Sequence, residues 1–321
     1  MRRSVAPPGL WLGVFLLALA AAVAGCGQSA PPTPPGIAAV VEAGAGGPVS
    51  VRWTGMAVAA PPTPLGRTAG LWPPWQMAAV FDGRLWVALG SRVARLRPGG
   101  RADVVRSPGG AALLLYAAAS RLWLVTDRSG RPAVLWTWFG HGFHRCAVLP
   151  AGLPRFVGAG GHPWILLIRP RQTLLWWMGR RVAIDVAAPE SVGVQGRDVW
   201  LPMAVGSRPG VAVARGGRVR HRFLPPASVA VLAVGGAPPW LLTSAGLVPI
   251  RGARPRWRSV RPWPWPPPAG LSLVDAGSWL LVRTGAGAGW WFNPRAGLFR
   301  GSVHLTLPAH TTVLDLVAWP Q

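Results

Sequence analysis

Arginine-rich turns are the residues of this sequence whose type and spacing best suit a chemical task. Three short segments, at 127–131, 169–172 and 206–210, read DRSGR, RPRQ and GSRPG. Each lies between apolar runs of the kind that form strands, so we expect turns there. Guanidinium groups offer forked donors that match carboxylate and phosphate oxygens. The predicted anion-binding residues are Arg128, Arg131, Arg169, Arg171 and Arg208. Solvated turns that bind nothing are the alternative.

Acid and base groups are too few and too scattered to indicate a catalytic centre. The chain has nine Asp and Glu residues, and glycoside hydrolysis needs two carboxylates that face each other. The candidates outside turns and outer strands share no motif, and they are Asp127, Glu190, Asp275 and Asp315. His141, His144 and Cys146 lie close in sequence, but they flank one turn. We therefore expect no metal site and no cofactor.

Tryptophan marks a repeat, and this repeat defines the elements that must position the turns. Seven Trp residues recur at spacings of 36 to 41 residues. They are Trp86, Trp123, Trp164, Trp200, Trp240, Trp279 and Trp319. A small or turn-forming cluster precedes most of them, and aliphatic residues follow. A period of about 40 residues is typical of a four-stranded propeller blade.

Proline gives a second marker with the same period. Short strands are closed by Pro108, Pro150, Pro189, Pro225, Pro267 and Pro308. Turn residues divide each unit into four short runs, and in the first unit these lie at 77–81, 84–89, 92–97 and 101–106. Six complete units fill residues 77–308.

The two ends of the repeat region predict how the fold closes. Residues 311–319, TTVLDLVAW, have the pattern of a lone first strand, and residues 37–60 offer three more, IAAVVEA, PVSVRWTG and MAVAA. A blade shared between the chain ends would remove the open seam of a ring. We therefore expect an all-β fold of about seven four-stranded blades, closed by pairing of the N- and C-terminal strands. Six blades are the alternative.

On these repeats, residues 37–321 resemble the β-propeller superfamily. The resemblance reaches no single family, because the sequence lacks the tryptophan-aspartate, kelch, sialidase and YWTD signatures. The repeat style DGRLWVAL is most similar to propellers of bacterial sensor ectodomains and secreted lyases. The resemblance implies a fold and leaves the function open, since one fold hosts many activities.

The periodic Trp residues are interpreted as packing between blades rather than as ligand contacts. The arginine-rich stretches at 215–223 and 251–261 are placed on outermost strands. Strict alternation would separate two faces, with Arg218, Arg220 and Arg222 on one and Val219, His221 and Phe223 on the other. Charge on an edge strand prevents aggregation. The alternative is a basic flank that lies against anionic lipid.

The N-terminus has the layout of an export signal. Arg2 and Arg3 precede an uncharged apolar run at 10–25. This run is shorter than a membrane-spanning helix, which needs about 20 residues. The run ends in Val23-Ala24-Gly25-Cys26, which resembles the lipobox of bacterial lipoproteins. The resemblance implies a signal peptide at 1–25, lipidation of Cys26 and an extracytoplasmic, membrane-anchored domain. Residues 26–36 are then a disordered, Pro-rich tether. An ordinary secreted protein is the alternative.

The composition is strongly basic. All 33 basic residues are Arg, and nine acidic residues leave a net charge of +24. A field of this size attracts polyanions, which outside the cell are anionic lipid, wall polymer or polysaccharide. Nucleic acid is not an expected partner. With Cys26 lipidated, Cys146 would have no partner for an intramolecular disulfide.

Three functions from different classes fit the sequence. We favour a non-enzymatic cell-envelope module that binds anionic ligands or assembles with an envelope protein. A propeller-type lyase or hydrolase acting on an anionic substrate is the second possibility, and it requires an acid or base beside the bound ligand. A ligand-sensing ectodomain is the third.

Overall fold

The computed structural model describes residues 33–55, 60–67, 76–118, 120–128, 130–157, 163–169, 173–177, 179–184, 193–205, 208–215, 218–236, 238–264, 271–276, 278–283 and 288–319. The chain divides into two compact units, Met1–Pro34 and Pro35–Gln321, and every described strand lies in the second. Within these ranges, no helix has the length and apolar character needed to cross a bilayer.

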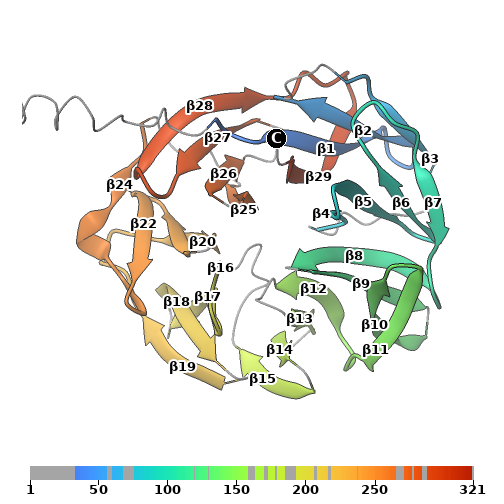
Figure 1. Ribbon diagram of the computed structural model, residues 1–321. Helices are drawn as coiled ribbons and strands as arrows, with labels where there is room; N and C mark the ends of the chain where they lie inside the picture. The colour runs from blue at the N-terminus through green and yellow to red at the C-terminus, as the bar shows by residue number, and fades with distance from the viewer. Residues whose placement is uncertain are drawn as a thin grey trace, which may run out of the picture. The chain divides into compact units, whose positions relative to one another are not determined.

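The described strands form seven antiparallel sheets arranged as a ring around a central axis (Figure 1). We number these blades in chain order. Blade 1 has the strand order β29-β1-β2-β3, blade 2 contains β4 to β7, and each later blade takes the next four strands up to β28 in blade 7. Blade 6 carries one additional strand, β24. The protein is therefore a seven-bladed β-propeller, and the predicted fold class is confirmed.

Each blade has the same order of strands from the axis outward. The innermost strands are β29 (Thr311–Trp319), β4 (Ala78–Phe81), β8 (Ala111–Ala118), β12 (Leu153–Val157), β16 (Gly193–Gln195), β20 (Val231–Gly235) and β25 (Ser272–Ala276). The second strands are β1 (Gly36–Ala43), β5 (Arg84–Leu89), β9 (Arg121–Arg128), β13 (Trp164–Ile168), β17 (Asp198–Val205), β21 (Trp240–Thr243) and β26 (Trp279–Arg283).

The outer half of each blade follows the same plan. The third strands are β2 (Pro48–Thr54), β6 (Arg92–Leu96), β10 (Arg131–Phe139), β14 (Thr173–Trp177), β18 (Arg208–Arg215), β22 (Gly246–Arg251) and β27 (Ala288–Asn293). The outermost strands are β3 (Thr63–Arg67), β7 (Asp103–Arg106), β11 (Gly142–Val148), β15 (Arg180–Ile184), β19 (Arg218–Phe223), β23 (Arg254–Pro255) with β24 (Arg261–Pro262), and β28 (Leu298–His304).

The outermost strand of blade 6 is interrupted. Its two short pieces, β23 and β24, both pair with β22, and the 3-10 turn η1 (Trp257–Ser259) lies between them. Each piece ends in a proline, which has no backbone N–H to donate to a ladder. Proline spacing therefore explains why this strand does not run uninterrupted.

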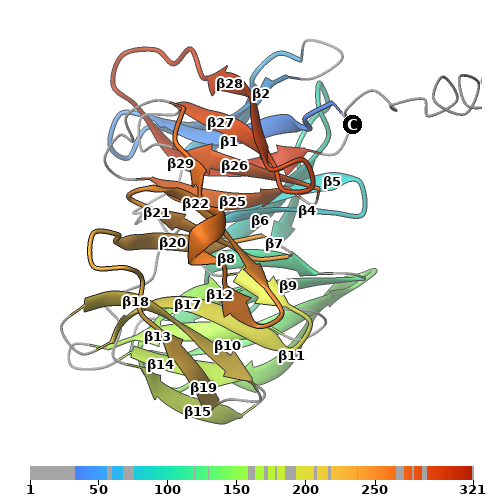
Figure 2. The same ribbon diagram turned by 90° about the vertical axis from the view of Figure 1, so that its left-hand side faces the viewer.

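The antiparallel order gives the ring two distinct faces. We call one the terminal face, because β1 begins there, β29 ends there, and Gly36 pairs directly with Trp319. Turns from first to second strand and from third to fourth strand also lie on the terminal face. Turns from second to third strand, and the connections between blades, lie on the opposite face. Figure 2 shows the ring from its edge, with the C-terminus on one side and the β28–β29 connection on the other.

Ring closure follows the predicted pairing. β29 is innermost in blade 1 and pairs along β1, so the two ends of the chain share one blade. Two details differ from the sequence prediction. The last strand of blade 1 is β3 rather than a strand at 56–60, where residues 56–59 lie outside the described residues. Trp319 ends an innermost strand, whereas the other six periodic Trp residues lie on second strands.

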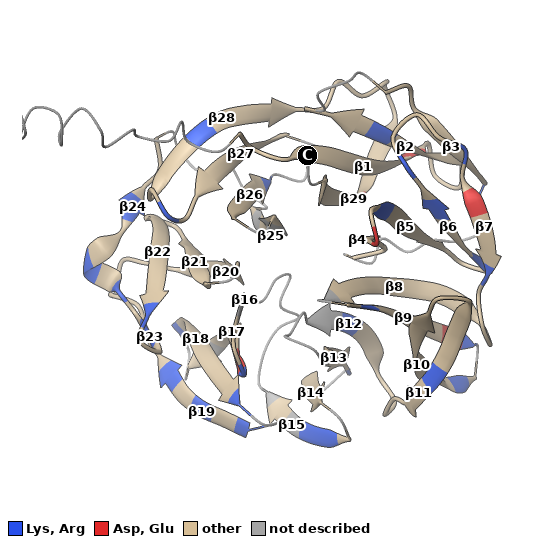
Figure 3. Ribbon diagram, in the orientation of Figure 1, with Lys and Arg blue, Asp and Glu red and all other residues tan. Residues whose placement is uncertain are grey.

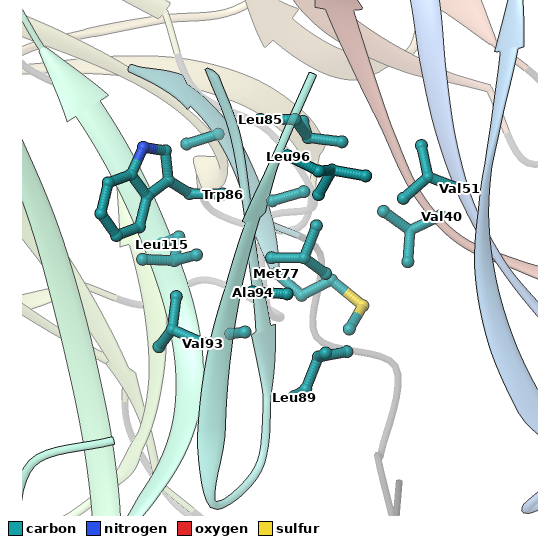
Figure 4. Packing of buried hydrophobic residues seen from close by; sticks show 14 of the residues in the cluster. Val40, Val51, Met77, Leu85, Trp86, Leu89, Val93, Ala94, Leu96 and Leu115 are labelled. Carbon is teal, nitrogen blue, oxygen red and sulfur yellow. The ribbon is translucent and has the colours of Figure 1, made fainter. Parts of the chain in front are cut away.

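Periodic Trp side chains pack between blades, as predicted. The six on second strands are between 0 and 4 % exposed, and burying each large ring is worth roughly 2–3 kcal/mol. Figure 4 shows the two sides of blade 2, where Leu85 and Leu96 point toward Val51 of blade 1. Trp86 lies on the other side, beside Leu115 of blade 3. Each sheet is therefore apolar on both faces.

The strict alternation expected along β19 is wrong. The register of β18 and β19 shifts so that Arg220 is an extra residue, which makes a β-bulge. Val219 consequently packs with Trp164 at the blade 4 interface. Phe223 packs on the other side of the sheet, stacked on Trp200 with 5.8 Å between ring centroids. One inserted residue is enough to exchange the faces of the strand.

Candidate functional site

Two of the predicted arginines oppose each other across a turn of blade 3. Arg128 ends β9 and Arg131 begins β10, and the two are directly paired in the hairpin register. Both are exposed. Like charges at directly opposed positions repel. An anion with two oxygens bound between these guanidinium groups would relieve that repulsion.

Arg169 and Arg208 occupy the corresponding turns of blades 4 and 5, where each is tied to a connection between blades. Arg169 Nε donates to the carbonyl oxygen of Ala151 at 2.7 Å, and Arg208 Nη2 donates to that of Pro225 at 2.8 Å. Gly152 lies close to the end of β13, because a Cβ there would lie 3.0 Å from Leu167 Cβ and 3.2 Å from the carbonyl oxygen of Ile168. Both guanidinium groups therefore stabilise the opposite face.

The four described arginines all lie on the opposite face, in three consecutive blades. Of these four, Arg128 and Arg131 pair with each other in the hairpin register, whereas the guanidinium groups of Arg169 and Arg208 donate to backbone carbonyls. Arg171 and Cys26, the remaining predicted site residues, lie outside the described residues. The part of the site that the structure describes is thus centred on the Arg128–Arg131 pair.

Exposed apolar side chains lie near the same turns. Val148 and Leu153 flank the connection from blade 3 to blade 4, and Leu224 lies in the connection that leaves blade 5. Leu153 is 55 % exposed. Arginine and apolar groups together are typical of surfaces that bind a partner. This part of the opposite face can therefore offer both charge and apolar contact.

Paired arginines recur in other hairpins, and the sequence interpretation missed them. Arg92 pairs with Arg106, Arg215 with Arg218, and Arg251 with Arg254. Arg215 is neutralised by Asp198 through two hydrogen bonds of 2.5 and 2.7 Å, and this contact raises the pKa of Arg215. The spacing of RSGR at 128–131 recurs in RGGR at 215–218 and RGAR at 251–254, and it would have revealed two of these pairs.

Asp315 is the one predicted catalytic candidate for which the structure shows a built environment. It lies on β29 and is 5 % exposed. Its carboxylate accepts hydrogen bonds from the backbone N–H groups of Ala78, at 2.9 Å, and Leu316, at 2.8 Å. Arg283 Nη1 lies 3.9 Å away. These partners come from blades 7, 1 and 2, so the carboxylate joins the closing blade to both neighbours.

Loss of solvation on burial has the largest influence on the pKa of the Asp315 carboxyl group. Burial raises the pKa of Asp315 to about 6, although the charge of Arg283 and the backbone N–H groups oppose the shift. A carboxylate with this environment joins blades together. The contacts described for Asp315 are with these two N–H groups and Arg283.

The other catalytic and metal candidates do not form a site in the part of the chain described. Asp127 is exposed at the end of β9, Asp275 lies on β25, and Glu190 falls outside the described residues. Cys146 Sγ donates to the carbonyl oxygen of His144, whose ring packs against Phe139. Among the described residues, no three His, Cys, Asp or Glu side chains gather as they would around a metal ion.

Charge is distributed unevenly around the ring (Figure 3). Arginine follows the outermost strands β11, β15, β19, β23, β24 and β28. In blade 2, by contrast, Asp103 accepts contacts from Arg84 at 3.1 Å and Arg95 at 3.4 Å. The described outermost strands of blades 3 to 7 are therefore basic.

Comparisons with known proteins identify the fold alone. No protein-family model matches the chain. No curated protein sequence matches it. The apo form of AztD from Citrobacter koseri is 11 % identical, with a TM-score of 0.51 over 86 % of this chain and 84 % of that chain. A second AztD structure from the same organism has 11 % identity and a TM-score of 0.49, over 86 % and 83 %.

A third solved structure is a putative 6-phosphogluconolactonase from Bacteroides fragilis. It is 10 % identical and has a TM-score of 0.46, over 90 % of this chain and 99 % of that chain. Identities this low carry no activity from one protein to another. The chain is thus a seven-bladed β-propeller whose function must be inferred from its own surface.

Proposed function

We propose that this protein is a non-enzymatic binding module, lipid-anchored at Cys26 on the outer side of a bacterial cell membrane. Its basic surface recognises anionic groups, and the Arg128–Arg131 pair on the opposite face is the primary contact for a soluble anionic ligand or polymer. An envelope protein with acidic side chains would present the same chemistry to this surface.

The observation that carries the proposal is the exposed Arg128–Arg131 pair. Neither guanidinium has a carboxylate partner among the described contacts, in contrast to Arg215, which Asp198 neutralises. Two unneutralised guanidinium groups on adjacent strands provide a forked site for one phosphate or carboxylate group. The apolar residues Val148 and Leu153 give the same region a surface for contact without charge.

Binding is tested with residues 33–321, which contain every described strand of the ring. Immobilised poly(glycerol phosphate) and polygalacturonate serve as phosphate and carboxylate probes over a salt gradient. We expect retention that falls as salt rises, and at least a tenfold weaker affinity for an Arg128→Gln, Arg131→Gln double variant. The control variant, Arg220→Gln with Arg222→Gln, removes the same charge from β19. Equal weakening by both variants would show that only net charge matters.

The anchor is tested separately on the full chain. Expressed in a bacterium fed with labelled palmitate, the protein should incorporate the label and sediment with membranes. A Cys26→Ser variant should do neither, because the thiol that accepts the lipid is gone. A wild-type chain that stays unlabelled and soluble would refute the anchor and leave the ligand test unaffected.

A further inference from the structure

Six consecutive blades each place an exposed arginine in a turn of the terminal face. Every member of the set lies in, or directly beside, a first-to-second or third-to-fourth turn. They are Arg101, Arg121, Arg180, Arg197, Arg254 and Arg295, in blades 2 to 7. Because one comes from each of blades 2 to 7, positive charge is spread over six of the seven blades on this side.

Carboxylates do little to offset this charge. Asp198 is buried against Arg215, and Asp103 lies between Arg84 and Arg95. By the same criterion, the exposed carboxylates at the described turns of the terminal face are Asp82 and Asp103, both in blade 2. Six arginines outnumber these carboxylates, so the face keeps a net positive field across blades 2 to 7, which favours a broad, flat anionic partner.

The position of the first strand of the ring also favours a broad anionic partner on the terminal face. β1 begins at Gly36 on the terminal face, ten residues after Cys26. An extended chain spans at most about 3.6 Å per residue, so a lipid on Cys26 can lie no farther than roughly 36 Å from this face. We propose that the terminal face lies flat on an anionic lipid bilayer. The orientation in this inference rests on the proposed anchor at Cys26. The pattern of charge on the terminal face does not depend on that anchor.

Two apolar side chains suit this contact. Phe139 and Leu298 are 52 % and 51 % exposed, and both flank third-to-fourth turns, in blades 3 and 7. Side chains of this kind enter the interfacial region of a bilayer while nearby arginines contact headgroups. On the opposite face, by comparison, Arg92, Arg169 and Arg208 donate to backbone carbonyls of the ring.

The first test measures binding of residues 33–321, which lack the anchor, to phosphatidylglycerol-containing and pure phosphatidylcholine vesicles. We expect salt-sensitive binding to the anionic vesicles alone. Each arginine near the surface contributes about fivefold to affinity. A variant with Arg101→Glu, Arg254→Glu and Arg295→Glu should therefore bind at least about a hundredfold more weakly.

A matched control carries Arg67→Glu, Arg106→Glu and Arg222→Glu. These exposed residues lie at or near the ends of fourth strands that reach the opposite face, and the charge change is identical. The control should lose less than about threefold relative to wild type. Thermal unfolding of both variants checks that the ring is intact. Equal losses in the two variants, or no loss in either, would overturn the orientation.

The second test reads the orientation directly. In a Cys146→Ser background, an environment-sensitive NBD label is attached to Leu298→Cys on the terminal face or to Val148→Cys on the opposite face. Added anionic vesicles should brighten the first label and shift its emission to the blue, with no change in the second. Brightening at Val148→Cys alone would reverse the proposed orientation.

The two proposals fail in different ways. Loss of vesicle binding in wild type, with polyanion binding still dependent on Arg128 and Arg131, would refute the membrane contact alone. Vesicle binding that depends on the terminal face, with no polyanion binding, would refute the ligand site alone.

Discussion

The strands β29 and β19 show how differently the inside and the rim of the ring use charge. β29 lies at the axis, and its single carboxylate, on Asp315, has fixed donors from three blades. β19 lies at the rim, where Arg218, Arg220 and Arg222 are all exposed. A buried charge without partners costs several kcal/mol, whereas water screens an exposed one. Inner strands can therefore hold a charge only where it has fixed partners, whereas outer strands hold exposed charges at little cost in stability.

Deleting residues 311–321 would break the inner half of this comparison most severely. The deletion removes β29, with the buried Leu314, Leu316 and Trp319, and leaves one edge of β1 unpaired. We expect the loss to exceed the about 5–15 kcal/mol of a typical domain, so that cooperative unfolding disappears. Urea denaturation followed by Trp fluorescence measures this. Deleting residues 320–321 alone should change little.

The substitution Asp315→Ala is expected to have the next largest effect on stability. It removes the acceptor for two backbone N–H groups and leaves the side chain of Arg283, which is 12 % exposed, without its carboxylate. We expect the free energy of unfolding to fall by about 3–5 kcal/mol. Asp127→Ala, at an exposed position, should stay within about 0.5 kcal/mol. Equal effects of the two substitutions would contradict the difference between inside and rim.

The pH dependence of stability sharpens the same point. The pKa of Asp315 is about 6 in the fold against an ordinary value of 3.8, so the folded state holds this proton more tightly. This contribution to stability is complete below the unfolded value and is lost as pH rises through the folded pKa. The loss amounts to about 3 kcal/mol.

Asp315→Asn should flatten this decline, because an amide does not titrate between pH 4 and 6. Urea unfolding measured at several pH values compares the two proteins. A wild-type slope that is unchanged in the variant would assign the decline to other groups.

The smallest expected effects lie on β19 and test its bulge. Val219 is half-buried against the blade 4 interface, whereas His221 is exposed. Val219→Ser should lower the free energy of unfolding by about 1 kcal/mol, and His221→Ser should stay within about 0.5 kcal/mol. Chemical denaturation resolves this difference. Similar losses would favour the unbroken alternation that the sequence predicted.

The architecture could be predicted from the sequence because the pattern that indicates a blade is repeated along the chain. Seven blades impose one pattern of turns and apolar strands seven times, so Trp and Pro spacing identified the units and the closing strand. Structural features that occur only once could not be predicted in this way. The bulge at Arg220 depends on one inserted residue, and β3 follows a stretch with no clear strand signal.

The candidate site was only partly predictable for a related reason. Hairpin order placed Arg128, Arg131, Arg169 and Arg208 on one face, because alternating turns must fall on alternating ends. Sequence could not show that Arg169 and Arg208 donate to backbone carbonyls, since those contacts depend on how the connections fold back. Asp315 was predicted as a catalytic candidate, and its burial beside Arg283 became visible only with blades 1, 2 and 7 in place.

The way β29 completes blade 1 also sets the order of events during biogenesis. β1 is among the first strands to be synthesised, yet its inner edge has no partner until residues 311–319 have been made. Contacts this distant in sequence form slowly. The ring can therefore close only after residues 311–319 have been synthesised, and a product truncated before them would expose the edge of β1 to chaperones and proteases.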